Sequence, residues 1–169
     1  MRLLLWVALL LTAYSCMVSA QGIDCNGPRF RGPAPQINEV HIFCGDLRQG
    51  RAEGYHSQSG GIAPDVVGVD RVHAIGVQGV YEGQVHFRTG AVHRSTFYPK
   101  FCTVAQIETS IRFAAANPIP GRGTDWSYGP SGPADGGADY CMGSDHRPLE
   151  IQFARTSRGG INTAFPDGR

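Results

Sequence analysis

The strongest periodic pattern in the chain predicts one helix. In TVAQIETSIRFAAAN (103–117), apolar side chains recur at helical spacing and share one face: Val104, Ile107, Ile111 and Ala114 or Ala115. Thr103 precedes this run and Gln106 follows three residues later, which is the pattern of a capping box. Asn117 and Pro118 then end the pattern, because proline cannot continue a helix. We therefore predict a capped helix over residues 103–117.

Apolar and polar positions alternate in other parts of the chain, and this alternation predicts strands. The first such run is INEVHIF (37–43). Glycines divide the segment 65–90 into two or three short strands, of which VYEGQVHF (80–87) has the clearest alternation. Near the end, LEIQFART (149–156) and GINTAFP (160–166) predict two strands joined by a turn.

Two segments lack such a pattern. Residues 45–54 are polar and predict a turn, and residues 118–147 are rich in Gly, Pro, Ser and Asp. A long segment without periodicity inside a compact domain is usually a functional or disordered loop. The order of strands, helix, loop and strands contains no β-α-β alternation, so we predict an α+β fold with antiparallel sheets and one main helix.

The first 20 residues predict a secretory signal peptide. Arg2 precedes an apolar run that ends in Val18-Ser19-Ala20, and this run is shorter than a membrane-spanning helix requires. We expect the mature chain to be secreted and to have no membrane anchor. Its layout would be an irregular arm over 21–36 and one compact domain over 37–169.

Four cysteines remain after the signal peptide is removed, and an even number in an exported chain predicts two disulfides. These are Cys25, Cys44, Cys102 and Cys141, for which the sequence allows three pairings. A zinc site is the weaker interpretation, because no two of them have C-x-x-C spacing.

The charge balance excludes a broad basic surface. The 15 basic residues include Arg2, so the mature chain has 14 of them against 14 acidic ones. Proteins that grip a long polyanion are usually basic, so a nucleic-acid substrate would be held locally.

Histidine is the over-represented chemical group, with six in the chain. Taken singly, each is more often structural or exposed than catalytic, and His73, His86 and His146 keep that interpretation. No His-x-His or H-E-x-x-H spacing predicts a metal site. The pair His41 and His56 differs, because a strand and a return segment could place both rings at one cleft. Two imidazoles can act as base and acid at the same pH, which suits RNA cleavage through the 2′-hydroxyl without an obligatory metal.

Four segments in order carry a resemblance to a known family. HIFCGD, GYHS, HRSTFYPKFCTVAQIETSIRFAAAN and INTAFP together resemble the EndoU family of uridylate-preferring endoribonucleases, and are closest to its compact bacterial branch. The likeness runs from about Val40 to Pro166. It implies an RNA substrate, cleavage of single strands at uridines, and a 2′,3′-cyclic phosphate product.

The resemblance also implies roles for particular residues. His41 and His56 would be the acid/base pair, Thr163 would recognise uracil or position the phosphate, and Phe165 would stack on the base. The family has tyrosine at the position of Phe165, and stacking survives that change. The family uses lysine as its third catalytic residue, and this chain has AVHRSTF at that segment. Arg94 is then the positional candidate, with His93 next to it and Lys100 as the other candidate.

Further predictions and alternatives follow from these observations. Some relatives are stimulated by manganese, but no carboxylate cluster here predicts a divalent ion. A toxin or effector role, a protein inhibitor as partner and a monomeric state fit a small secreted nuclease. The first alternative is a secreted RNA- or protein-binding module that keeps the fold without turnover. The second is another hydrolase that uses histidine with Glu39, Glu82 or Glu150.

Overall fold

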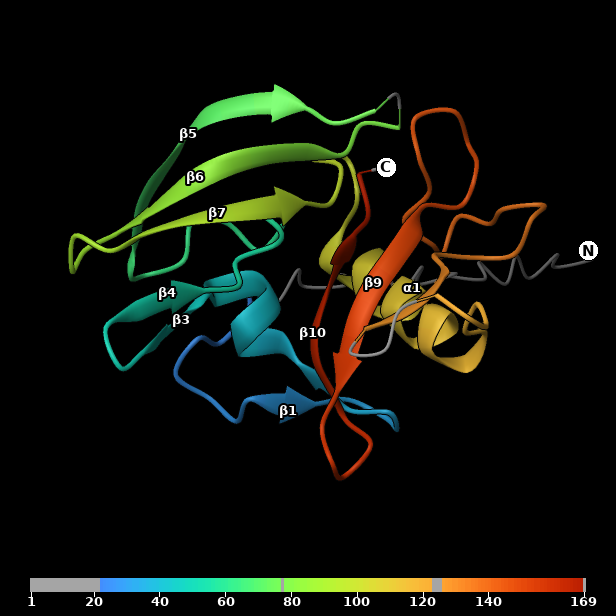
Figure 1. Cartoon of the computed structure of the whole chain (residues 1–169), viewed down its shortest axis with the longest axis horizontal. Coiled ribbons are helices and arrows are strands. Elements are labelled where there is room, and N and C mark those ends of the chain that lie inside the picture. Colours follow the sequence, from blue (N-terminus) through green and yellow to red (C-terminus); the bar gives the residue numbers. More distant parts are fainter. Residues whose placement is uncertain (1–21, 77, 123–125, 169) are drawn as a thin grey trace, which may run out of the picture.

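The computed structural model describes residues 22–76, 78–122 and 126–168. The predicted signal peptide lies outside these residues. They form one α-helix, one short π-helix and ten strands, arranged as in Figure 1. The helices are η1 (Val40–Cys44) and α1 (Val104–Ala116). The strands are β1 (Phe30–Arg31), β2 (Ile37–Asn38), β3 (Asp46–Arg48), β4 (Arg51–Glu53), β5 (Val66–Ala74), β6 (Tyr81–Phe87), β7 (Val92–Phe97), β8 (Ser127–Pro130), β9 (Glu150–Arg155) and β10 (Ile161–Pro166).

Helix α1 confirms the prediction from its periodicity. Thr103 is its N-cap and accepts a hydrogen bond from the backbone N–H of Gln106 at 3.2 Å, while the Gln106 side chain accepts one from the Thr103 N–H at 2.8 Å. Ile107, Ile111 and Ala114 on the apolar face are fully buried. The helix therefore begins and ends where local signals place it.

A five-stranded sheet packs against α1, in the order β1-β2-β10-β9-β8. Its neighbours are antiparallel, except for the parallel pair β2 and β10, which joins the beginning of the domain to its end. Figure 1 shows α1 behind β9. Ile107 and Ile111 pack there with Phe153 and Ile161, in the first of two hydrophobic cores. The α+β prediction is thus confirmed, with one parallel pair added.

A second, three-stranded sheet has the order β5-β6-β7 and lies on the other side of the molecule (Figure 1). Along β6, Tyr81, Val85 and Phe87 are buried, and the alternate residues are half-exposed. The predicted alternation is therefore confirmed. The buried face of β6 packs into the second core, together with Val40 and Tyr55.

The predicted strand over residues 37–43 is wrong beyond Asn38, because the chain turns there into η1. All five residues of η1 are buried, so the segment has no exposed face that would distinguish a helix from a strand. Val40 and Cys44 pack in the second core, whereas Ile42 and Phe43 pack in the first. A helix achieves this because it sends its side chains in several directions around one axis.

The two segments without a sequence pattern also contain strands. Residues 45–54 are not a simple turn but form the hairpin β3–β4, whose tip at Gln49 and Gly50 has positive φ. The segment 118–147 contains β8, which pairs with β9. Two disulfides, Cys25–Cys44 and Cys102–Cys141, confirm that prediction and settle the pairing. None of the described helices is long and apolar enough to cross a membrane.

Candidate active site

The fold brings His41 and His56 together between the two cores. Their ring centroids are 5.8 Å apart and the rings are tilted by 49°. Both residues are buried, at 6% and 5% exposure. His41 lies on η1 and His56 follows β4, so the two rings come from adjacent segments of the chain. The sequence-based pairing is therefore matched by proximity in the structure.

Backbone hydrogen bonds hold the two segments in register. The N–H of Tyr55 donates to the carbonyl of His41 at 2.8 Å, and the N–H of His56 donates to the carbonyl of Ile42 at 2.7 Å. Gly54 has φ +75°, and a Cβ there would collide with the His41 carbonyl oxygen. Only glycine permits this close approach, so Gly54 fixes the separation of the two rings.

Asp46 holds the ring of His41. Its Oδ2 lies 3.1 Å from Nδ1 of His41, and Arg29 donates to both carboxylate oxygens. Burial disfavours the charged form of Asp46, but the hydrogen bond from His41 and the charge of Arg29 outweigh it, so the pKa of Asp46 lies below its ordinary value. The ionised carboxylate therefore accepts a hydrogen bond from Nδ1–H of His41, which leaves Nε2 for a substrate.

The ring of His56 contacts uncharged groups, whereas that of His41 contacts a carboxylate. Its Nδ1 lies 3.0 Å from the carbonyl oxygen of Thr96 and 2.9 Å from the hydroxyl of Ser95. A carbonyl can only accept, so Nδ1 carries the proton and Nε2 presents a lone pair. Burial, followed by the nearby charge of His41, lowers the pKa of His56 to about 3. His56 is therefore a neutral, base-type imidazole near neutral pH.

Strand β10 adds Thr163 and Phe165 to the pair. The Thr163 hydroxyl lies 3.4 Å from Nε2 of His56. The Phe165 ring stacks on the His56 ring with a centroid separation of 4.8 Å. Trp126 meets Phe165 edge-on at 5.5 Å, and sequence analysis had not assigned it to the site. Its only signal in the sequence is that it is a large aromatic residue within the Gly/Pro-rich segment 118–147.

The structure does not bring Arg94 or Lys100 to the pair. Arg94 is 73% exposed in its side chain and forms an ion pair with Glu82 on the outer face of the three-stranded sheet. Lys100 lies over the Tyr81 ring, with Nζ 5.3 Å from the centroid. Within the described ranges, no hydrogen bond or ion pair joins either cation to His41 or His56. The residue next to Arg94 occupies the inner face instead.

That residue is His93. On β7 it shares a face with Ser95, whose hydroxyl contacts His56. Burial lowers the pKa of His93, the charge of Glu53 raises it, and the charge of His41 lowers it further. The face of β7 that carries His93 and Ser95 is therefore the one turned toward the pair. The two-residue period of a strand could have identified it, since an inward Ser95 implies an inward His93.

The three glutamates of the alternative hydrolase interpretation are engaged elsewhere. Glu39 interacts with Arg31 and Glu108, Glu82 pairs with Arg94 and His73, and Glu150 pairs with Arg122. No group of three or more His, Cys, Asp or Glu side chains among the described residues is placed to hold a metal ion.

The comparisons with known proteins agree with the geometry. The family model of the bacterial EndoU nuclease matches residues 35–168, which include β2 to β10, α1 and both histidines. Searches of curated proteins and of solved structures returned no match. The chain belongs to the bacterial EndoU nuclease family.

Proposed function

We propose that this protein is a secreted endoribonuclease that cleaves RNA at uridines and leaves a 2′,3′-cyclic phosphate. The observation that carries the proposal is the pair of buried histidines at 5.8 Å, whose Nδ1 atoms face a carboxylate in one case and a carbonyl in the other. Such a difference assigns opposite proton-transfer roles to two chemically identical side chains. Family membership supports the nuclease activity, and the two disulfides support export to an oxidising compartment.

His56 is the general base in this proposal. Its Nε2 lone pair removes the proton of the 2′-hydroxyl, and the resulting oxygen attacks the adjacent phosphorus. The lowered pKa of His56 keeps the lone pair free of a proton near neutral pH. The hydrogen bond from Nδ1 to the Thr96 carbonyl fixes the tautomer that the step requires.

His41 is the general acid. Its Nε2–H gives a proton to the 5′ oxygen as the P–O5′ bond breaks, so the products are a 2′,3′-cyclic phosphate and a 5′-hydroxyl. The Asp46 carboxylate accepts a hydrogen bond from Nδ1–H of His41 and so orients Nε2–H toward the leaving oxygen, in the way an aspartate orients the histidine of a catalytic triad.

Charge on the phosphoryl oxygens needs a third group, and we assign it to His93. Its ring N–H would donate to a non-bridging oxygen from the neutral imidazole, because burial outweighs the charge of Glu53 and lowers the pKa of His93. This replaces Arg94 and Lys100 in that role.

Uracil would bind at β10. Thr163 offers a hydroxyl at the edge of the site, and Phe165 and Trp126 offer adjoining aromatic surfaces. Stacking on such rings is worth about 1–3 kcal/mol per base. No step in this mechanism is assigned to manganese or another cofactor.

The test uses the mature protein and a single-stranded oligonucleotide that contains one uridine, in the presence of EDTA. We expect cleavage 3′ of the uridine and a cyclic phosphate, identified by mass spectrometry. His41→Ala and His56→Ala should each lower the rate at least about 100-fold. His73→Ala, which alters an exposed histidine on β5, is the matched control and should cleave like wild type.

A substrate with deoxyuridine at the cleavage position tests the nucleophile, because it lacks the 2′-hydroxyl. Cleavage of that substrate would refute the transphosphorylation step. The second candidate, a binding module without turnover, is favoured by the absence of the family lysine beside the histidine pair. RNA binding without any cyclic phosphate product would establish that alternative.

A further inference from the structure

Residues 22–34 lie before the family match, which begins at residue 35, yet they are fixed to the element that carries His41. Cys25 is joined by a disulfide to Cys44, the last residue of η1. Strand β1 pairs with β2, which directly precedes η1. These two attachments lie on either side of Arg29 in the chain, so the position of Arg29 relative to η1 is fixed from both directions.

Arg29 extends the hydrogen bonding of His41 away from the cleft. Its Nη1 donates to Oδ2 of Asp46 at 2.7 Å, and its Nη2 donates to Oδ1. The same Oδ2 lies 3.1 Å from Nδ1 of His41. A planar guanidinium that holds both oxygens fixes the plane of a carboxylate. The carboxylate in turn fixes the direction of the ring that donates to it.

Burial makes this pairing necessary. The side chain of Asp46 is 4% exposed, and a buried carboxylate is costly unless a cation pairs with it. Arg48 is a second cation nearby, but its Nε lies 3.6 Å from Oδ2 and its side chain is 51% exposed. One contact of that length does not fix the plane of the carboxylate. Without Arg29, Asp46 would therefore be free to turn away from His41.

We propose that Arg29 is a positioning residue for RNA cleavage, which holds Asp46 so that His41 presents Nε2 to the leaving oxygen, and that the Cys25–Cys44 disulfide keeps Arg29 in place. This inference rests on the proposed function, in which His41 is the general acid. It adds to the site a group that lies outside the residues matched by the family model. Arg29 acts through Asp46, so its loss should lower kcat and leave KM almost unchanged.

The kinetic test compares the mature protein with Arg29→Gln and Arg29→Lys, on the uridine-containing oligonucleotide in EDTA. Arg29→Gln should lower kcat at least about tenfold and keep KM within about twofold, because the acid loses its orientation while the RNA contacts remain. Arg29→Lys should lie between Arg29→Gln and wild type, since lysine keeps the charge but not the fork. Arg29→Lys also carries the test if circular dichroism shows that Arg29→Gln does not fold.

Arg122→Gln is the matched control. The side chain of Arg122 is 41% exposed, against 39% for Arg29, and it also pairs with a carboxylate, that of Glu150. Neither residue of this control pair contacts His41 or His56 in the described ranges. Arg122→Gln should therefore cleave like wild type.

An external cation provides a second kinetic test. The Arg29 side chain is partly exposed, so Arg29→Ala opens a path from solvent to Asp46. Guanidinium chloride, far below the concentration that unfolds the protein, should restore part of the kcat of Arg29→Ala, whereas sodium chloride at the same concentration should not. Guanidinium should not restore Asp46→Asn, which lacks the carboxylate charge.

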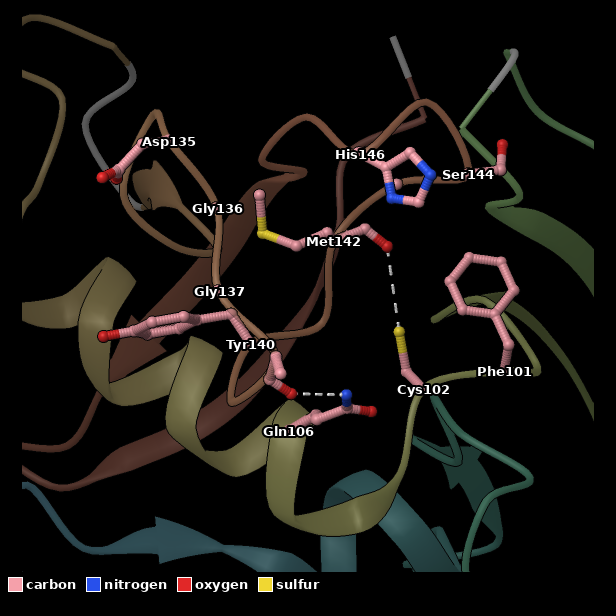
Figure 2. Close-up of a pocket in the computed structure, with 12 residues that line it drawn as sticks. Phe101, Cys102, Gln106, Asp135, Gly136, Gly137, Tyr140, Met142, Ser144 and His146 are labelled. Atoms are coloured by element: carbon pink, nitrogen blue, oxygen red, sulfur yellow. Dashed lines mark hydrogen bonds between the residues drawn. The ribbon is translucent and has the colours of Figure 1, made fainter.

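The chain offers a control for the disulfide as well. Cys102–Cys141 borders a separate pocket of about 610 Å³, where Figure 2 shows Cys102 next to Phe101. The lining of this pocket includes neither histidine of the pair. Removal of this second disulfide should leave the histidine site as it is.

The two disulfides are compared at a temperature at which both double variants are folded. Cys25→Ala/Cys44→Ala should lower kcat, because the chain before Arg29 is released from η1. Cys102→Ala/Cys141→Ala should keep the kcat of wild type. Equal values of kcat in the two double variants would overturn the role given to the Cys25–Cys44 disulfide.

The ring nitrogens of His41 give a measurement that does not depend on cleavage. Nuclear magnetic resonance of nitrogen-labelled protein, above the pH at which the ring titrates, reports which nitrogen carries the proton. Wild type should show the Nδ1–H tautomer alone, because Asp46 accepts from Nδ1. Arg29→Gln should show both tautomers, and Arg122→Gln should match wild type.

These measurements separate this inference from the proposed function. A wild-type protein that does not cleave RNA would refute the proposed function, and the tautomer of His41 would still decide the role of Arg29. The role of Arg29 is overturned if Arg29→Gln keeps the kcat of wild type, if its loss appears only in KM, or if His41 keeps a single Nδ1–H tautomer in that variant.

Discussion

At the scale of single residues, the site depends on which of two adjacent residues on a strand faces inward. His93 and Arg94 are adjacent on β7, yet His93 interacts electrostatically with His41, whereas Arg94 pairs with Glu82 on the outer face. A sequence motif aligns positions along the chain, but it does not specify the direction of a side chain. An error of one residue therefore exchanges the inner face for the outer face.

We predict that His93→Ala lowers kcat for uridine cleavage at least about tenfold, because a phosphoryl oxygen loses its donor. Arg94→Ala and Lys100→Ala should stay within about twofold of wild type, since neither side chain reaches the pair. Initial rates at saturating RNA measure the effect, and circular dichroism checks the fold of each variant. A large loss in Arg94→Ala together with normal activity in His93→Ala would reverse the assignment.

The other site residues show what sequence can and cannot provide at this scale. His41, His56, Thr163 and Phe165 were predicted from short motifs to share a site, and the fold brings these four side chains together. Asp46 and Trp126 were missed as site residues. Their roles arise from contacts across a turn and across sheet neighbours, which residue type alone does not reveal.

At the scale of elements, the segment from η1 to His56 determines the geometry of the pair. We predict that Gly54→Ala destabilises the protein by at least about 1 kcal/mol more than Gly50→Ala does. Both glycines have positive φ, at +75° and +79°, so both substitutions carry the same backbone strain. Only at Gly54 would the new Cβ also meet the His41 carbonyl, because Gly50 has open space around it.

Urea denaturation of both variants measures this difference, and their cleavage rates test its consequence for the site. Gly54→Ala should lose activity because the bonds that hold Tyr55 and His56 to η1 must shift, whereas Gly50→Ala should stay active. Equal stability losses in the two variants would show that backbone strain alone accounts for the requirement for glycine.

The sequence predicted an element closely where the signals for that element are local. Helix α1 was predicted closely because its cap and its apolar face are both local signals. The π-helix η1 was mistaken for a strand because it is buried on every side by two separate cores. Hairpin β3–β4 was missed because its residues are mostly exposed on both faces and show no alternation.

At the scale of the whole molecule, the fold class and the disulfide count followed from the sequence, but the topology did not. The parallel pair β2 and β10 joins Ile37 to Ile161, and no local pattern links residues so far apart. The same arrangement brings Thr163 to His56. The site therefore forms only when the two ends of the domain pair. The pKa of a buried site histidine should then differ between the folded and the unfolded chain, so stability should depend on pH.

We predict that this linkage makes stability fall as the pH falls below about 6.5. The pKa of His56 is about 3 in the folded protein and 6.5 in its ordinary state, so between these values the unfolded chain takes up a proton that the folded protein rejects. The contribution is fully present above pH 6.5 and is lost toward pH 3, with a slope of up to about 1.4 kcal/mol per pH unit. His93, whose pKa is also lowered, acts in the same direction.

Urea midpoints measured from pH 7.5 to pH 5.5 test the prediction, because carboxylates of ordinary pKa stay ionised over this window. His56→Gln should show a shallower decline than wild type, since its unfolded chain no longer gains the extra proton at position 56. His73→Gln should decline as steeply as wild type, because its exposed ring lies on the outer sheet face. If wild type and His56→Gln declined in parallel, burial of His56 would not be the source of the acid sensitivity, and its assignment as a neutral base would lose its physical support.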